Sequence, residues 1–101
     1  MFSKKRIILI GIISVMIACS PALYIPIEQD GVNSGVPYEN LLEGRKLYVS
    51  KCGSCHNLYL PEKYTSKEWE KNLLEMKDQV KIADDELMMI KTYLDLKAKK
   101  L

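Results

Sequence analysis

Cys52-Gly53-Ser54-Cys55-His56 is the stretch of this 101-residue sequence that decides how the chain folds. The two thiols stand three positions apart, and an imidazole follows the second thiol directly. On a helical turn this spacing brings both sulfur atoms to one side of the backbone. His56 is the only histidine, and the only cysteine outside the motif is Cys19. One short segment therefore combines two nucleophilic sulfurs with one metal-binding nitrogen.

A C-x-x-C-H motif is the attachment signature of c-type haem. The two thiols add across the vinyl groups of the porphyrin, and the imidazole ligates the iron. We therefore expect one covalently bound haem c, attached to Cys52 and Cys55, with His56 as an axial ligand of its iron.

Three other uses of the motif remain open. A zinc site needs about four ligands, and beyond Cys19, which stands directly at the predicted cleavage point, the only thiol and imidazole ligands are Cys52, Cys55 and His56. A thioredoxin-like dithiol is expected among strands, whereas the flanking sequence has helical periodicity. The third alternative is a structural disulfide. Haem attachment is favoured because the chain also carries an export signal.

The N-terminus predicts export from the cytoplasm. Three cations in residues 1–6 precede an apolar run over residues 7–18, which is typical of a signal peptide. As a helix the run spans only about 18 Å, too short for a bilayer core of roughly 30 Å.

The sequence Met16-Ile17-Ala18-Cys19 resembles a bacterial lipobox. That resemblance implies acylation of Cys19 and anchoring in the inner or outer membrane, facing the periplasm. An uncleaved anchor and a soluble periplasmic protein are the alternatives.

Three regions are predicted along the chain. Residues 1–18 are the signal peptide, residues 19–37 a lipidated N-terminus and flexible tether, and residues 38–101 the haem domain. The tether prediction rests on prolines and glycines without a steady period. Without the signal, the chain has 12 basic and 13 acidic residues, a formal charge of −1 that gives no indication of nucleic-acid binding.

Three helices and no sheet are predicted, so the fold class is all-α. The first helix begins near Asn40 and runs to the cysteines. The second begins at a capping box formed by Thr65 and Glu68. The third begins at residues 83–86 and ends among lysines at residues 97–100. The apolar stripe of the second helix comprises Trp69, Leu73, Met76 and Val80. The third helix has two stripes, Leu87, Ile90, Leu94 and Ala98, and Met89, Tyr93 and Leu96.

The segment before the motif resembles the N-terminal helix of small class I cytochromes c. In that family a glycine and an aromatic residue four positions later pack against an aromatic residue of the C-terminal helix. Gly44, Tyr48 and Tyr93 match this pattern. The resemblance implies about three helices wrapped around one haem. It also implies that a backbone carbonyl at Leu60-Pro61 accepts the second ring N–H of the axial histidine.

Met76 is the predicted sixth ligand of the iron. It shares a stripe with Trp69 and Leu73, and the segment 65–69 followed by Met76 resembles a subgroup of small monohaem and dihaem cytochromes with a ligand methionine on such a helix. Methionine ligation raises the reduction potential and favours electron transfer. Met88 and Met89 are the alternatives, and Met76 as a plain core residue is another.

The predicted function is single-electron transfer in an extracytoplasmic respiratory or dehydrogenase chain, between redox protein partners. An accessory subunit of a larger complex would have the same redox role. The alternative is a haem-based gas-binding or sensor protein with an open sixth site.

We expect no enzyme activity and no small-molecule substrate, because no catalytic constellation remains once the single histidine is assigned to iron. Lysines near the motif, Lys46, Lys51 and Lys63, either steer an acidic partner or only solvate exposed helix faces. Tyr59, Tyr64 and Trp69 either bind haem propionates or pack.

Overall fold

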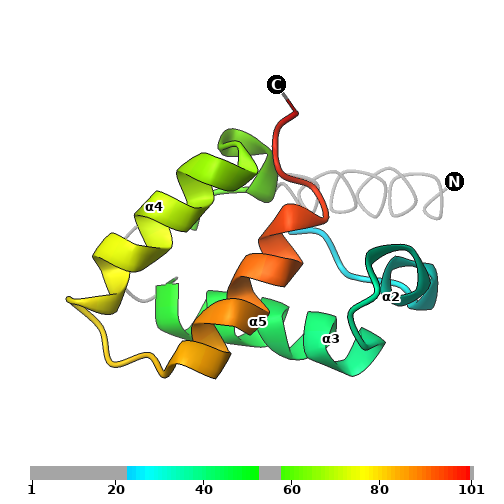
Figure 1. Ribbon diagram of the computed structural model, residues 1–101, viewed down its shortest axis with the longest axis horizontal. Helices are drawn as coiled ribbons and strands as arrows, with labels where there is room; N and C mark the ends of the chain where they lie inside the picture. The colour runs from blue at the N-terminus through cyan, green and yellow to red at the C-terminus, as the bar shows by residue number, and fades with distance from the viewer. Residues whose placement is uncertain (1–22, 53–57, 101) are drawn as a thin grey trace, which may run out of the picture.

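The computed structural model describes residues 23–52 and 58–100. The elements, in chain order, are α2 (Glu28–Ser34), α3 (Tyr38–Leu47), the π-helical turn η2 (Tyr48–Cys52), the 3-10 turn η3 (Pro61–Lys63), α4 (Ser66–Lys77) and α5 (Asp84–Asp95) (Figure 1). Within these residues the only β-type pairing is an isolated bridge between Thr65 and Lys99. The predicted all-α fold is confirmed.

The first predicted helix is present as α3, and it begins two residues earlier than expected. The N–H groups of Asn40 and Leu41 both bond to the carbonyl of Pro37, at 2.9 and 3.2 Å. Proline at the helix entrance is favourable because it has no N–H that needs a partner. Asn40 therefore lies inside the first turn rather than capping it.

Helices α3 and α5 cross at Gly44, as the sequence predicts. A Cβ atom on Gly44 would lie 2.1 Å from the carbonyl oxygen of Met89 and 3.0 Å from Cβ of Tyr93. No side chain fits in that space, so glycine is what allows the two backbones to approach. This crossing forms the base of the domain, and α4 packs beside α5 (Figure 1).

The capping box of α4 is confirmed. The Thr65 hydroxyl accepts a bond from the backbone N–H of Glu68 at 3.2 Å, and the Glu68 carboxylate accepts one from the N–H of Thr65 at 3.0 Å. These bonds hold the pKa of Glu68 below its ordinary value. Because the folded-state pKa is lowered, the contribution of Glu68 to stability is present at neutral pH and is lost as the pH falls through that pKa.

Replacing the cap residue, Thr65→Ala, is expected to lower the free energy of unfolding by about 1 kcal/mol, because the backbone N–H of Glu68 at the start of α4 loses its acceptor. Urea denaturation followed by far-UV circular dichroism measures this. Lys67→Ala, an exposed change in the same turn, is the control. Equal stabilities of the two variants would mean that the cap contributes nothing.

The C-terminal end of α5 differs from the prediction. The helix stops at Asp95 instead of continuing to the lysines. Beyond it, the N–H of Lys99 bonds to the carbonyl of Tyr64 at 2.9 Å. A backbone partner from a distant segment thus replaces the expected last helical turn.

The N-terminal segment also differs from the prediction of a flexible tether over residues 19–37. Residues 28–34 form α2, which ends at Gly35 in the left-handed conformation, with φ 73°. The carbonyl of Tyr24 accepts bonds from the Tyr93 hydroxyl at 2.7 Å and from Arg45 Nε at 3.1 Å. Residues 23–36 are therefore part of the folded domain. Contacts with residues far along the chain override the local turn-forming composition.

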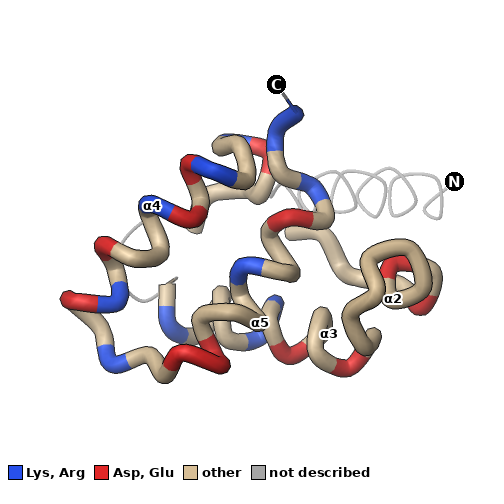
Figure 2. The backbone as a smooth tube through the Cα atoms, in the orientation of Figure 1, with Lys and Arg blue, Asp and Glu red and all other residues tan. Residues whose placement is uncertain are grey.

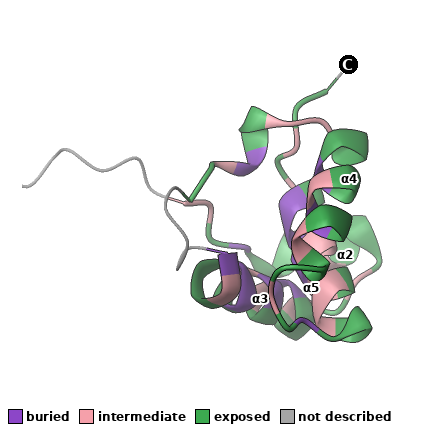
Figure 3. Ribbon diagram, turned by 90° about the vertical axis from the view of Figure 1, so that its left-hand side faces the viewer, coloured by how far each residue is buried: buried purple, intermediate pink, exposed green. Residues whose placement is uncertain are grey.

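The buried core lies between α3, α4 and α5 (Figure 3). Its members are Leu47, Tyr48, Cys52, Trp69, Leu73, Ile82, Ile90, Tyr93 and Leu94. None of the helices in the described part of the chain has the length and hydrophobicity needed to cross a bilayer.

Candidate haem-attachment site

The structure places two of the five predicted site residues. Cys52 ends the turn η2, and Met76 lies in the last turn of α4. Cys19, Cys55 and His56 lie outside the described residues. Of the predicted site, the structure therefore describes the side formed by Cys52 and α4.

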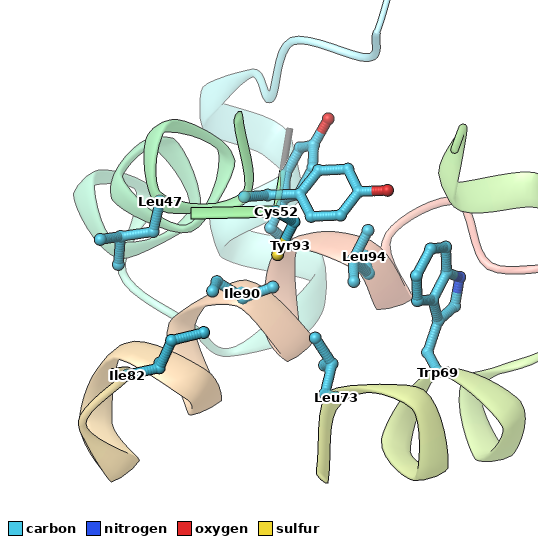
Figure 4. Packing of buried hydrophobic residues seen from close by; sticks show 9 residues of the cluster. Leu47, Cys52, Trp69, Leu73, Ile82, Ile90, Tyr93 and Leu94 are labelled. Carbon is cyan, nitrogen blue, oxygen red and sulfur yellow. The ribbon is translucent and has the colours of Figure 1, made fainter. Parts of the chain in front are cut away.

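The side chain of Cys52 points into the apolar interior. Its exposed fraction is 6%, and Figure 4 shows it directed toward Ile90 of α5. The turn that ends at Cys52 is π-helical, a rare conformation that is frequent at functional sites. Tyr48 and Cys52, at the two ends of this turn, are both buried. The chain thus enters the C-x-x-C-H segment from inside the core.

The surroundings of Cys52 suit a porphyrin. Side chains from α4 and α5 and the loop between them form an apolar cluster with it: Trp69, Leu73, Ile82, Ile90 and Leu94. Among the described residues, no polar or charged side chain is buried. A macrocycle attached at this sulfur would therefore meet hydrocarbon and aromatic surface, which is favourable for an apolar ring.

Three aromatic rings fix the position of α4 relative to the turn η2. Tyr48 and Trp69 pack edge to face with ring centroids 5.9 Å apart, and Tyr64 meets Trp69 in the same way at 5.0 Å. Tyr48 also contacts Tyr93, with centroids 6.2 Å apart. Edge-to-face pairs are favourable because the positive ring edge meets the negative face.

The tyrosine hydroxyls of the core act as hydrogen-bond donors. Burial raises the pKa of Tyr48 far above its ordinary value and raises the pKa of Tyr93 to about 12. Both phenols therefore stay protonated at neutral pH. Tyr48 donates to the carbonyl of Tyr59, in the segment that follows the motif. This bond ties the segment after the motif to the turn η2, which precedes the motif.

Each carbonyl from residue 59 to residue 61 accepts a donor from the protein. Besides the bond from Tyr48, Lys63 N–H bonds to the Leu60 carbonyl at 3.0 Å, and Trp69 Nε1 bonds to the Pro61 carbonyl at 2.8 Å. The indole of Trp69 is therefore used in packing and in this bond. Since a carbonyl has two lone pairs, an imidazole N–H at Leu60-Pro61 would share an acceptor that already has a partner.

The predicted stripe of α4 faces the core. Leu73 is 2% exposed and Met76 is half-buried against the same cluster. Met88, by contrast, is 68% exposed and lines a hollow of about 410 Å³ between α4 and α5, together with Lys77 and Lys91. Met89 is half-buried, with its carbonyl against Gly44. Among the three methionines of the domain, Met76 lies on the helix face shared with Leu73 and Trp69.

Two of the predicted docking lysines have contacts within the chain. Lys51 Nζ bonds to the Lys81 carbonyl at 3.3 Å, and Lys63 Nζ lies 5.2 Å from the centre of the Tyr59 ring. The described residues contain no group of three His, Cys, Asp or Glu side chains arranged to hold a metal ion.

Comparison with known families identifies the domain. A family model described as dihaem cytochrome c matches residues 48–101, more than half of the chain. The matched region begins at the turn η2 and includes the C-x-x-C-H motif, α4 and α5. No curated protein and no solved structure matches. The chain is therefore a haem-based electron-transfer protein, and it belongs to the dihaem cytochrome c family.

Proposed function

We propose that this chain is a monohaem electron carrier, with haem c attached to Cys52 and Cys55 and its iron ligated by His56 and Met76. One observation supports this most directly: the first cysteine of the only C-x-x-C-H is buried in an apolar cluster that includes Leu73 of α4, one turn before Met76. A c-type haem supplies an iron that accepts and releases one electron without a substrate.

One haem per chain follows from the side chains available. The name of the matched family refers to two haems, but the sequence has three cysteines and one histidine. A second attachment would need two more cysteines and a second ligand of the motif type. Cys19, the remaining cysteine, stands alone after the apolar run.

The residues around the proposed site have distinct tasks. Ile90 and Leu94 of α5 present hydrocarbon surface to the porphyrin and exclude water from it. Leu73 and Trp69 position α4, which presents the Met76 thioether. A thioether ligand and an apolar environment both raise the reduction potential. We therefore expect the reduction potential of this haem to lie in the range of His/Met-ligated carriers.

We propose that this carrier lies in the periplasm, anchored to the inner or outer membrane through acylated Cys19. The basic segment at residues 1–6, the apolar run at residues 7–18 and the lipobox-like sequence support this. Donor and acceptor are redox proteins of a respiratory or dehydrogenase chain, and Lys46, which is exposed, belongs to the surface offered to an acidic partner.

Met76→Ala tests the proposed ligand. The wild type, matured with haem-attachment machinery, is expected to show sharp reduced α and β bands and the weak far-red ferric band of sulfur-ligated iron. Met76→Ala should abolish the ferric band and lower the reduction potential, because the sixth ligand is lost. Optical spectra of both oxidation states and a redox titration measure this.

Met88→Ala is the matched control, since its side chain is 68% exposed and its spectrum should match the wild type. If Met76→Ala keeps the ferric band, Met76 is not the ligand. If the wild type is high-spin and binds CO readily, the carrier proposal gives way to a gas-binding protein.

A further inference from the structure

The segment of residues 23–36, here called the N-terminal strap, is fastened to the haem domain at Tyr24. Its carbonyl accepts bonds from Tyr93 of α5 and Arg45 of α3, at 2.7 and 3.1 Å. Its ring lies under Lys97, whose Nζ is 4.7 Å from the ring centre. Two helices and the C-terminal tail thus all contact one residue near the start of the strap.

The strap is also closed on itself. Asp30 of α2 accepts bonds from the Tyr24 hydroxyl at 2.5 Å and from the Ile27 N–H at 2.9 Å. These bonds fix the turn between Tyr24 and α2. The hydrogen bond from Tyr24 holds the pKa of Asp30 below its ordinary value, so the carboxylate stays charged at neutral pH.

Large apolar side chains of the strap point into solvent. The exposed fractions are 61% for Ile25, 56% for Ile27 and 75% for Val32. These are three of the eight exposed large hydrophobic residues in the described chain, within a span of eight positions. Isolated exposed residues are ordinary on a protein surface, whereas these three lie within eight positions on one folded segment.

The length of chain before the strap indicates what covers it. Only three residues separate Cys19 from Leu23, and four Cα–Cα steps extend to roughly 14 Å at most. Because Leu23 packs against the core, the domain stays within about this distance of an acyl anchor at Cys19. A long tether, by contrast, would let the domain move away from the bilayer.

We propose that the N-terminal strap lies on the lipid surface, with Ile25, Ile27 and Val32 inserted at the boundary between headgroups and acyl chains. This inference rests on the lipid anchor of the proposed function. Side chains at this boundary gain from burial of apolar area. Because the strap is bonded to α3 and α5, the contact also orients the haem domain relative to the membrane.

The charges of the strap define the kind of lipid contact. Its only charged residues are Glu28 and Asp30, both acidic, and Figure 2 shows no basic residue on α2. Attraction to anionic headgroups is therefore not the driving force. Contact with zwitterionic phosphatidylcholine is expected, and adding phosphatidylglycerol should leave the contact unchanged or weaken it.

Site-specific labelling of the lipidated, haem-loaded full chain tests the contact. An environment-sensitive thiol dye is attached to Ile27→Cys or Val32→Cys, and the protein is bound to phosphatidylcholine vesicles. Leu74→Cys of α4 and Met88→Cys of α5 are the matched controls, because both are exposed and line the same hollow between α4 and α5. Helix α4 lies at the opposite end of the described domain from α2 (Figure 1). On binding, emission should shift to shorter wavelength at positions 27 and 32 and stay unchanged at positions 74 and 88.

Vesicle flotation separates failure of the anchor from failure of the contact. If the protein floats with the vesicles but all four positions give the same emission, the strap does not touch lipid, while the anchor stands. If the protein does not float, the anchor itself is wrong, and the contact inferred from it falls as well. A much larger shift with phosphatidylglycerol vesicles would contradict an apolar contact.

Discussion

Gly44→Ala is expected to destabilise the haem-loaded protein by about 3 kcal/mol, the upper end for overpacking a core. The added methyl carbon would lie 2.1 Å from the carbonyl oxygen of Met89 and 2.8 Å from its carbonyl carbon. Both atoms belong to the backbone of α5, so no rotation of a side chain relieves the clash. Helices α3 and α5 would have to separate. Urea denaturation monitored by the haem absorption and by circular dichroism measures the loss.

Glu43→Ala is the control for this change, because it is exposed on the same helix. Alanine is more favourable than glycine in a helix by about 1 kcal/mol. A glycine without tertiary contacts would therefore make the protein more stable when replaced by alanine. A Gly44→Ala protein as stable as the wild type, or more so, would show that α3 and α5 do not approach this closely.

Trp69→Ala should have the second large effect, about 3 to 5 kcal/mol, as for other buried aromatic residues changed to alanine. The ring is 4% exposed and packs against Tyr48 and Tyr64. Its loss leaves a cavity between the turn η2 and α4. Because α4 presents Met76, we also expect a weaker ferric sulfur-ligation band in the same variant. Denaturation and optical spectra measure the two effects.

Trp69→Phe separates packing from hydrogen bonding. It keeps an aromatic ring but removes the donor to the Pro61 carbonyl, found at 2.8 Å. An unpartnered buried carbonyl costs about 1 to 3 kcal/mol, so this variant should lie between the wild type and Trp69→Ala. Leu74→Ala, 54% exposed on the same helix, is the neutral control. Equal losses for the two Trp69 variants would assign the whole effect to the hydrogen bond.

Local signals explain which parts of the fold the sequence predicts. The capping box at Thr65 and Glu68 involves residues three positions apart, and its bonds form wherever a helix starts there. The stripe of Trp69, Leu73 and Met76 follows from helical periodicity alone. The C-x-x-C-H motif is local as well, since the proposed attachment and ligation share five residues. For the candidate site, the sequence therefore indicates the chemistry without any tertiary information.

Contacts between distant residues explain what the sequence did not predict. The bond from Tyr93 to the Tyr24 carbonyl joins residues 69 positions apart. It fixes the N-terminal strap, which has the composition of a tether, to the folded domain. The bond from Lys99 to the Tyr64 carbonyl likewise ends α5 earlier than its lysines suggest. Backbone carbonyls are present at every residue, so no sequence pattern marks the ones that distant donors select.

The sequence by itself determined the haem chemistry, the all-α class and the face of α4 that turns inward, because each depends on residues within a few positions of one another. Only the tertiary structure decided that the Cys52 side chain points into the core, that Met88 faces outward and that the N-terminal strap belongs to the domain. These outcomes depend on which surfaces α3, α4 and α5 bury against each other. That choice minimises exposed apolar area over the whole domain rather than within any single segment.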